Sequence, residues 1–163
     1  MPAKRVAYDW TLEILTLLCF LASFYPLLFY ASLGEDVLFP VHYNINGEID
    51  GWGGRRYLLT LSLVNISFYI ILSIFEKYYK WCKYPFKVKD NDPNSKYIYR
   101  DGVRLMRHMK FFIVLILSYF INSFYAFILG KGNGPNNNIM VLLLIGLVAS
   151  VIIYSERMLK YRK

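Results

Sequence analysis

The sequence predicts an all-α integral membrane protein, a bundle of four transmembrane helices that forms a single membrane domain over residues 1–163. Apolar residues make up 56% of the chain and aromatic residues 18%, which is more than soluble domains ordinarily contain. The apolar residues gather in four blocks, at about 11–31, 57–75, 111–129 and 139–155. Basic residues lie almost entirely between alternate blocks, as in proteins that cross a membrane several times.

Each block is long enough to be a transmembrane helix. About 20 apolar residues cross roughly 30 Å of hydrocarbon, and the fourth block is at the short end of the tolerated range. An irregular segment in lipid would leave its backbone groups unpaired, so we expect helix throughout. The first block is longer than a signal-peptide core and no small-residue cleavage site follows Tyr30, so we expect it to remain as an anchor. Pro26 predicts a kink within it.

The basic residues predict the orientation. Sixteen of the 19 lie in the N-terminal tail, in the loop 76–110 and in the C-terminal tail, and only Arg55, Arg56 and Lys131 fall on the other side. The positive-inside rule then puts both termini in the cytoplasm (N-in/C-in). It makes the loop 32–56 a small extracytoplasmic loop between the first two helices.

The net charge of +8 does not indicate nucleic-acid binding. A cytoplasmic loop between two spans is basic because it sets the topology, and its charges lie favourably against anionic lipid headgroups. We therefore expect the lipid bilayer as its partner and no nucleic acid. Residues 96–107 are expected to form a short helix at the membrane surface, ahead of the third span.

Polar residues within the spans predict hydrogen bonds between helices, because polar side chains in hydrocarbon turn towards one another. Those that share a helical face are Ser62, Asn65, Tyr69 and Ser73 in the second span, and Ser118 and Asn122 in the third. Gly146 and Ser150 offer a close-packing surface on the fourth span.

Neither an enzyme nor a cofactor or metal site is predicted. The sequence has no Ser/His/Asp or Cys/His combination, no zinc-ligand spacing and no glycine-rich phosphate loop. His42 and His108 are expected on opposite sides of the membrane. Cys19 is expected inside the first span and Cys82 in the reducing cytoplasm, so we expect no disulfide between them.

The loop 32–56 is the most informative segment. Val41, Tyr43 and Ile45 alternate with polar residues and run into Asn46-Gly47, a pattern typical of a strand that leads to a turn. We therefore expect a small hairpin packed on the helix ends.

The same loop carries a sequence motif. Residues 40–53, PVHYNINGEIDGWG, resemble the Pro-x-His-Phe-Asn-x-x-Gly-x-x-Asp-x-x-Gly signature of a bacterial membrane domain of unknown function. That domain also forms the N-terminal end of SdpI-type immunity proteins, which protect a producer cell from its own secreted toxin. The resemblance covers the first span, the loop and the second span, and it implies a location in the bacterial cytoplasmic (inner) membrane. The SdpI-specific second half has no counterpart here, and Leu33-Gly34-Glu35 stands where many members have Leu-Pro-Asp.

The motif residues are the candidate site, either partner-binding or loop-structuring. They are Pro40, His42, Tyr43, Asn44, Gly47, Asp50 and Gly53. In the structural interpretation His42 and Asn44 tie the loop's own backbone together, and Asp50 pairs with Arg55 or Arg56. In the functional interpretation the polar side chains bind an extracytoplasmic partner, whereas a metal would need more ligands than one histidine and two carboxylates.

Three functions are compatible with the sequence. The first is recognition of an extracytoplasmic partner through the loop, in an immunity-like or envelope-sensing role. The second is a structural or accessory subunit of a larger membrane complex. The third is a transporter, because an intramembrane charge ordinarily marks an ion path; the intramembrane polar candidates are Glu13, Asn65 and Asn122. The loop favours the first function, since its residues go beyond what membrane insertion requires.

Overall fold

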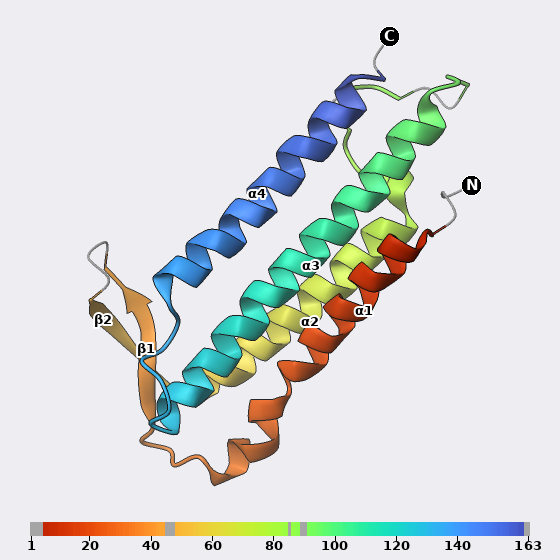
Figure 1. Ribbon diagram of the computed structural model, residues 1–163. Coiled ribbons are helices and arrows are strands. Elements are labelled where there is room, and N and C mark those ends of the chain that lie inside the picture. The colour runs from red at the N-terminus through yellow and green to blue at the C-terminus, as the bar shows by residue number, and fades with distance from the viewer. Residues whose placement is uncertain (1–4, 45–47, 85, 89–90, 162–163) are drawn as a thin grey trace.

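The computed structural model describes residues 5–44, 48–84, 86–88 and 91–161 (Figure 1). Its helices are α1 (Ala7–Ala22), α2 (Arg56–Lys77), α3 (Ser95–Ile128) and α4 (Asn137–Leu159), with short 3₁₀ helices η1 (Tyr25–Ser32) and η2 (Tyr79–Trp81). Strands β1 (Leu38–Tyr43) and β2 (Ile49–Gly54) form a hairpin between η1 and α2. Within the described residues four helical segments are long and apolar enough to cross a membrane, which confirms the predicted number of spans.

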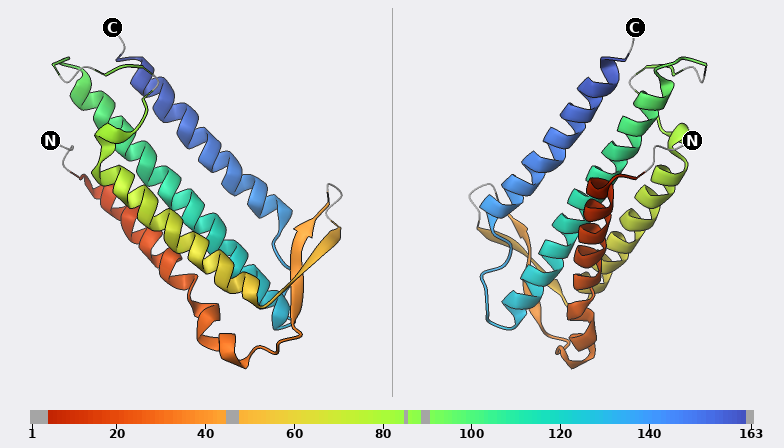
Figure 2. Two further views of the ribbon diagram at one scale, coloured as in Figure 1. Left: turned by 180° about the vertical axis from the view of Figure 1, so that it is seen from behind. Right: turned by 45° about the vertical axis from the view of Figure 1, so that its right-hand side comes forward.

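The central helix of the bundle is α3. It packs against α1, α2 and α4, whereas α1 and α2 contact each other far less than either contacts α3. Figure 2 shows α4 at the edge of the bundle, beside α3. A Cβ at Gly146 would lie 2.5 Å from the Phe112 ring, so the close approach of α4 to α3 requires glycine there, as the sequence predicted.

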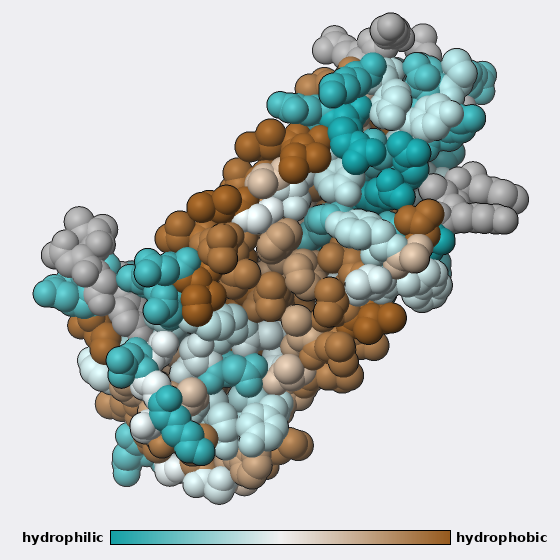
Figure 3. Space-filling view, in the orientation of Figure 1, coloured by the Kyte–Doolittle hydropathy of each residue, from teal (hydrophilic) through white to brown (hydrophobic). Residues whose placement is uncertain are grey.

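The two ends of the bundle differ in chemistry. The basic end is where α1 and α3 begin and α2 and α4 end, and the hairpin lies at the opposite, hairpin end (Figure 1). Figure 3 shows an apolar band between the two more polar ends. Large apolar side chains such as Leu63 and Leu142 are 63% and 68% exposed, a pattern that fits contact with lipid.

Helix α3 is longer than predicted. One helix runs from Ser95 to Ile128, where we expected a third span at 111–129 and a separate surface helix at 96–107. Its 34 residues extend about 51 Å at about 1.5 Å per residue, well beyond roughly 30 Å of hydrocarbon. Its first turns are buried at Ile98, Asp101 and Val103. Ile98 packs with Tyr154 and Met158 of α4, and Asp101 pairs with Arg157 of the same helix, so these turns pack on α4.

The segment after η2 is docked on α3 by Tyr84. A Cβ at Gly102 of α3 would lie 2.6 Å from Cε1 of Tyr84, so the ring rests directly on the helix backbone. The Tyr84 hydroxyl donates a hydrogen bond to the Tyr79 carbonyl at 2.9 Å. Burial raises the pKa of the Tyr84 phenol, which keeps the hydroxyl protonated as a donor.

The predicted kink of the first span is present. Helix α1 ends at Ala22 and the chain continues in η1, with Pro26 near its start. The freed Ala22 carbonyl accepts a hydrogen bond from Asn122 Nδ2 at 3.3 Å, and Ser118 Oγ donates to the Cys19 carbonyl at 2.8 Å. A broken helix is tolerated in lipid when neighbouring helices satisfy the freed groups in this way.

Asn65 joins the same network from α2. It is fully buried, and its Nδ2 donates to Ser23 Oγ at 2.9 Å and to Ser118 Oγ at 3.5 Å. Asn65, Ser118 and Asn122 thus each bond to a neighbouring helical segment, whereas Ser62 donates to the Leu58 carbonyl of its own helix.

Candidate functional site

The expected hairpin is present, and its pairing is irregular. The two strands are antiparallel, with Leu38 opposite Gly54, Pro40 opposite Trp52 and His42 opposite Gly51. The register shifts between Pro40 and His42, where Pro40 has no N–H to give to the ladder and a bulge is the usual consequence.

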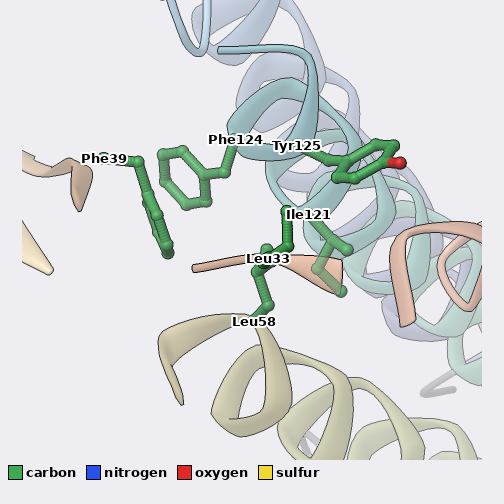
Figure 4. Packing of buried hydrophobic residues seen from close by; sticks show 6 residues of the cluster. All are labelled: Leu33, Phe39, Leu58, Ile121, Phe124 and Tyr125. Carbon is green, nitrogen blue, oxygen red and sulfur yellow. The ribbon is translucent and has the colours of Figure 1, made fainter. Parts of the chain in front are cut away.

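Phe39 anchors the hairpin in the bundle. Its side chain is fully buried and lies 5.1 Å from the ring of Phe124 and 6.5 Å from that of Tyr57, centroid to centroid. Figure 4 shows Phe39 pointing towards Phe124, in the cluster that Leu33, Leu58, Ile121 and Tyr125 complete. The sequence motif did not include Phe39. The signal in the sequence was a large aromatic residue directly before the first residue of the motif.

Two further motif residues are structural. Pro40 is fully buried, and a Cβ at Gly53 would lie 2.6 Å from Val41 Cγ1 and 2.7 Å from Tyr57 Cδ2. Gly53 therefore lets β2 approach the start of α2, and neither residue presents a functional group to a partner.

Asn44 closes the hairpin loop on Glu48. Its backbone N–H donates to the Glu48 carbonyl at 2.9 Å, its Oδ1 accepts from the Glu48 N–H at 2.9 Å and its Nδ2 donates to Glu48 Oε2 at 2.8 Å. Gly47 lies outside the described residues, as does the side chain of Tyr43, whose backbone pairs with Ile49.

His42 and Asp50 pair with each other at the surface. His42 Nδ1 is hydrogen-bonded to Asp50 Oδ1, and the two side chains are 72% and 43% exposed. The pairing of Asp50 with Arg55 or Arg56 is therefore not seen. Arg55 instead donates to Glu35 Oε1 at 2.6 Å and to the Leu33 carbonyl at 2.7 Å, because it follows the end of β2 and faces the segment before β1.

Apolar side chains are exposed beside this pair. Trp52 is 54% exposed and Ile49 37% exposed, and both belong to β2, the strand that carries Asp50. The indole of Trp52 also rests 6.2 Å from the Phe127 ring. The hairpin thus exposes a polar pair and an aromatic side chain that is partly held in place.

A metal site is not formed by the described residues. No three His, Cys, Asp or Glu side chains of the described part of the chain come together as ligands. The hairpin can offer hydrogen bonds and apolar contact to a partner.

A second polar site lies at the basic end, and the sequence analysis missed it. Lys110 is 1% exposed and its Nζ lies 2.8 Å from Glu13 Oε1 and 3.1 Å from Glu76 Oε2. Arg107 pairs with two carboxylates: its Nε lies 2.7 Å from Glu76 Oε1, and its Nη1 lies 3.0 Å from Asp9 Oδ1. We call these five residues the ionic cluster.

The ionic cluster gives Glu13, one of the intramembrane polar candidates, a partner on α3, Lys110. Glu76 belongs to α2, which ends at Lys77 rather than near 75, and the basic residues come from the unexpected extension of α3. Arg104, Arg107 and Lys110 recur every third residue, so they share one face of a helix, and that spacing was the signal in the sequence.

Fold and surface together define a multi-pass membrane protein, with four apolar helices long enough to span a bilayer. Residues 17–66 match the family described as Domain of unknown function (DUF1648). The matched stretch runs from α1 through η1 and the hairpin into α2, so the chain contains an uncharacterised membrane-type domain that includes the motif loop. The chain matches no curated protein and no solved structure at a significant level.

Proposed function

We propose that this protein lies in the bacterial cytoplasmic membrane with both termini inside, and that it recognises an extracytoplasmic partner through the hairpin. The orientation is supported by charge, because 12 of the 15 basic residues that the structure describes belong to segments of the basic end and three belong to the hairpin end. The hairpin then faces the cell exterior or periplasm, where a secreted toxin or an envelope signal would meet it.

The observation that carries the proposal is that some motif residues shape the hairpin while others are exposed. Pro40, Asn44 and Gly53 shape the hairpin and Phe39 anchors it, whereas His42 and Asp50 are exposed and contribute little to its stability. An exposed ion pair is worth about 0–1 kcal/mol. Within the described residues His42 Nε2 makes no hydrogen bond, so a partner can use it without disturbing the fold.

The chemistry of this face suits a protein or peptide partner. Recognition surfaces commonly combine a partly buried aromatic anchor with polar groups that set orientation, and the hairpin exposes both kinds of group, Trp52 and the His42–Asp50 pair. The resemblance of the loop to SdpI-type immunity proteins supports an immunity-like or envelope-sensing role.

The test is affinity purification of the tagged protein from its native membrane, followed by mass spectrometry. The His42→Ala/Asp50→Ala double variant removes both partners of the pair together and leaves the anchor intact, and Lys131→Ala is a control at the same end of the bundle. We expect the wild type and the control to capture a partner that the double variant does not capture, when the three proteins are compared at equal yields of folded protein. Equal capture by all three would refute recognition through His42 and Asp50.

The orientation has its own test. In a chain with Cys19→Ser and Cys82→Ser, a cysteine replaces either Lys131 at the hairpin end or Lys160 at the basic end. We expect a membrane-impermeant maleimide to label the Lys131→Cys variant in intact spheroplasts, and the Lys160→Cys variant only after lysis. The opposite pattern would overturn the proposed topology.

A second candidate function, that of an accessory subunit, draws on α4. This helix packs mainly on α3 and leaves apolar side chains exposed along its length, among them Val141, Leu144, Ile145, Val148 and Ile152. Such a face can contact another membrane protein as well as lipid. Partners that co-purify equally with wild type and the hairpin double variant would favour this function.

A further inference from the structure

The basic end contains a cavity between α1 and α2. Its volume is about 400 Å³, and it exists because α1 and α2 both pack on α3 while contacting each other little. The charged residues that line it are Arg5, Glu13, Glu76, Lys77, Arg107 and Lys110. Helix α3 forms its floor through Val103, Arg107 and Lys110.

The cavity has an excess of positive charge, with four cations against two carboxylates in its lining. Both carboxylates already have cationic partners: Glu13 pairs with Lys110, and Glu76 pairs with Lys110, Arg107 and Arg5. Among the described residues Lys77 has no carboxylate partner, and its ammonium lies 5.4 Å from the centroid of the Tyr78 ring. The spare charge is therefore concentrated at the mouth, on Lys77 and on the unused nitrogens of Arg5.

The cavity lies between the ends of α1 and α2 and the middle of the bundle. On its inner side the rings of Phe20 and Tyr69 stack at 4.4 Å between α1 and α2, and Lys110 Nζ lies 5.4 Å from the centroid of the Tyr69 ring. Arg5 precedes the first residue of α1, and Lys77 is the last residue of α2. Trp10, 52% exposed and 4.8 Å below the Arg5 guanidinium, is placed as aromatic residues are in the interfacial region.

We propose that this cavity binds a phosphate-bearing anion, supplied by an anionic phospholipid headgroup or by free phosphate. Its volume falls in the range of about 300–1,000 Å³ of small-ligand sites, and basic pockets between transmembrane helices bind anionic headgroups. Arg5 and Lys77 contact the phosphate, Arg5 through paired N–H groups that match two phosphate oxygens. Lys110 and Arg107 stay held by their carboxylates and form the floor. This site is independent of the hairpin.

The test uses the full chain, purified without added lipid. Native mass spectrometry measures retention of phosphatidylglycerol against phosphatidylethanolamine, and a thermal-shift titration measures binding of inorganic phosphate alone. The cavity variant is Arg5→Gln/Lys77→Gln, whose Glu76 keeps two cationic partners. The control, Lys96→Gln/Lys160→Gln, removes the same charge from exposed positions at the same end. Thermal unfolding without ligand checks that both variants fold.

We expect preferential retention of phosphatidylglycerol. The cavity variant should weaken this retention about 25-fold, at about fivefold for each of the two basic residues lost, and the control should leave it unchanged. If inorganic phosphate at millimolar concentration stabilises the wild type and displaces the lipid, the ligand is the free ion. If phosphate neither stabilises the wild type nor displaces the lipid, the ligand is the lipid headgroup. Equal retention of both lipids without a phosphate-induced shift would overturn the proposal, as would equal losses in the cavity and control variants.

Discussion

Replacing Phe39 by alanine tests whether a single side chain holds the hairpin on the bundle. Phe39 is fully buried against Phe124 and Tyr57, at the hairpin end where water reaches the strands. An isolated two-stranded hairpin is at best marginally stable in water. The hairpin therefore depends on this contact for its structure.

The size of the effect follows from the burial. Truncation of a buried phenylalanine to alanine costs about 3–5 kcal/mol, which raises the population of the detached hairpin by on the order of 10²- to 10³-fold or more. Leu38, the preceding residue, is 56% exposed, and surface substitutions ordinarily change stability by less than about 0.5 kcal/mol. Leu38→Ala is thus the matched control on the same strand.

Hydrogen exchange in detergent or nanodiscs measures detachment directly. We expect the amides of β1 and β2 to lose their protection in Phe39→Ala and to keep it in Leu38→Ala, while the amides of α3 remain protected in both. If the strand amides of Phe39→Ala exchanged as slowly as those of wild type, the hairpin would be held by other contacts and the reasoning would be wrong.

Three further predictions address the other contacts. Lys110→Met leaves Glu13 without its cation and is expected to lower the free energy of unfolding by about 3–5 kcal/mol, measured by thermal unfolding. Adding Glu13→Gln should restore part of this loss. Equal melting temperatures of the single and double variants would contradict the pairing. Gly146→Leu drives a side chain into Phe112 and is expected to cost about 1–3 kcal/mol, whereas an unchanged melting temperature would mean that α4 moves freely on α3. Gly51→Val places atoms within 2.8 Å of His42 Cβ, so it should abolish partner capture while strand protection in hydrogen exchange persists; normal capture would show that the position of His42 is unimportant.

The number of spans was predictable because hydropathy is a local property. Each span can be recognised from about 20 consecutive residues, and Pro26 predicts the break of the first helix. The extension of α3 was not predictable in the same way. Taken alone, Arg104, Arg107 and Lys110 indicate a solvated surface, and only the fold brings Asp9 and Glu76 to them from distant parts of the sequence.

The hairpin shows a similar limit. Alternating residues ahead of Asn46-Gly47 were enough to predict strands and a turn. They did not predict which side chains meet, because the register shifts on both sides of His42, which lies opposite Gly51 and pairs with the neighbouring Asp50. The sequence suggested Arg55 or Arg56 as the partner of Asp50, whereas the strands place His42 beside it.

The central position of α3 has a consequence for biogenesis. Helices α1 and α2 leave the ribosome first, with Glu13 and Glu76 still lacking Lys110 and with the Ala22 carbonyl still lacking Asn122. Unpaired polar groups in the membrane are costly, so the first two helices are expected to become fully stable only when the third helix arrives.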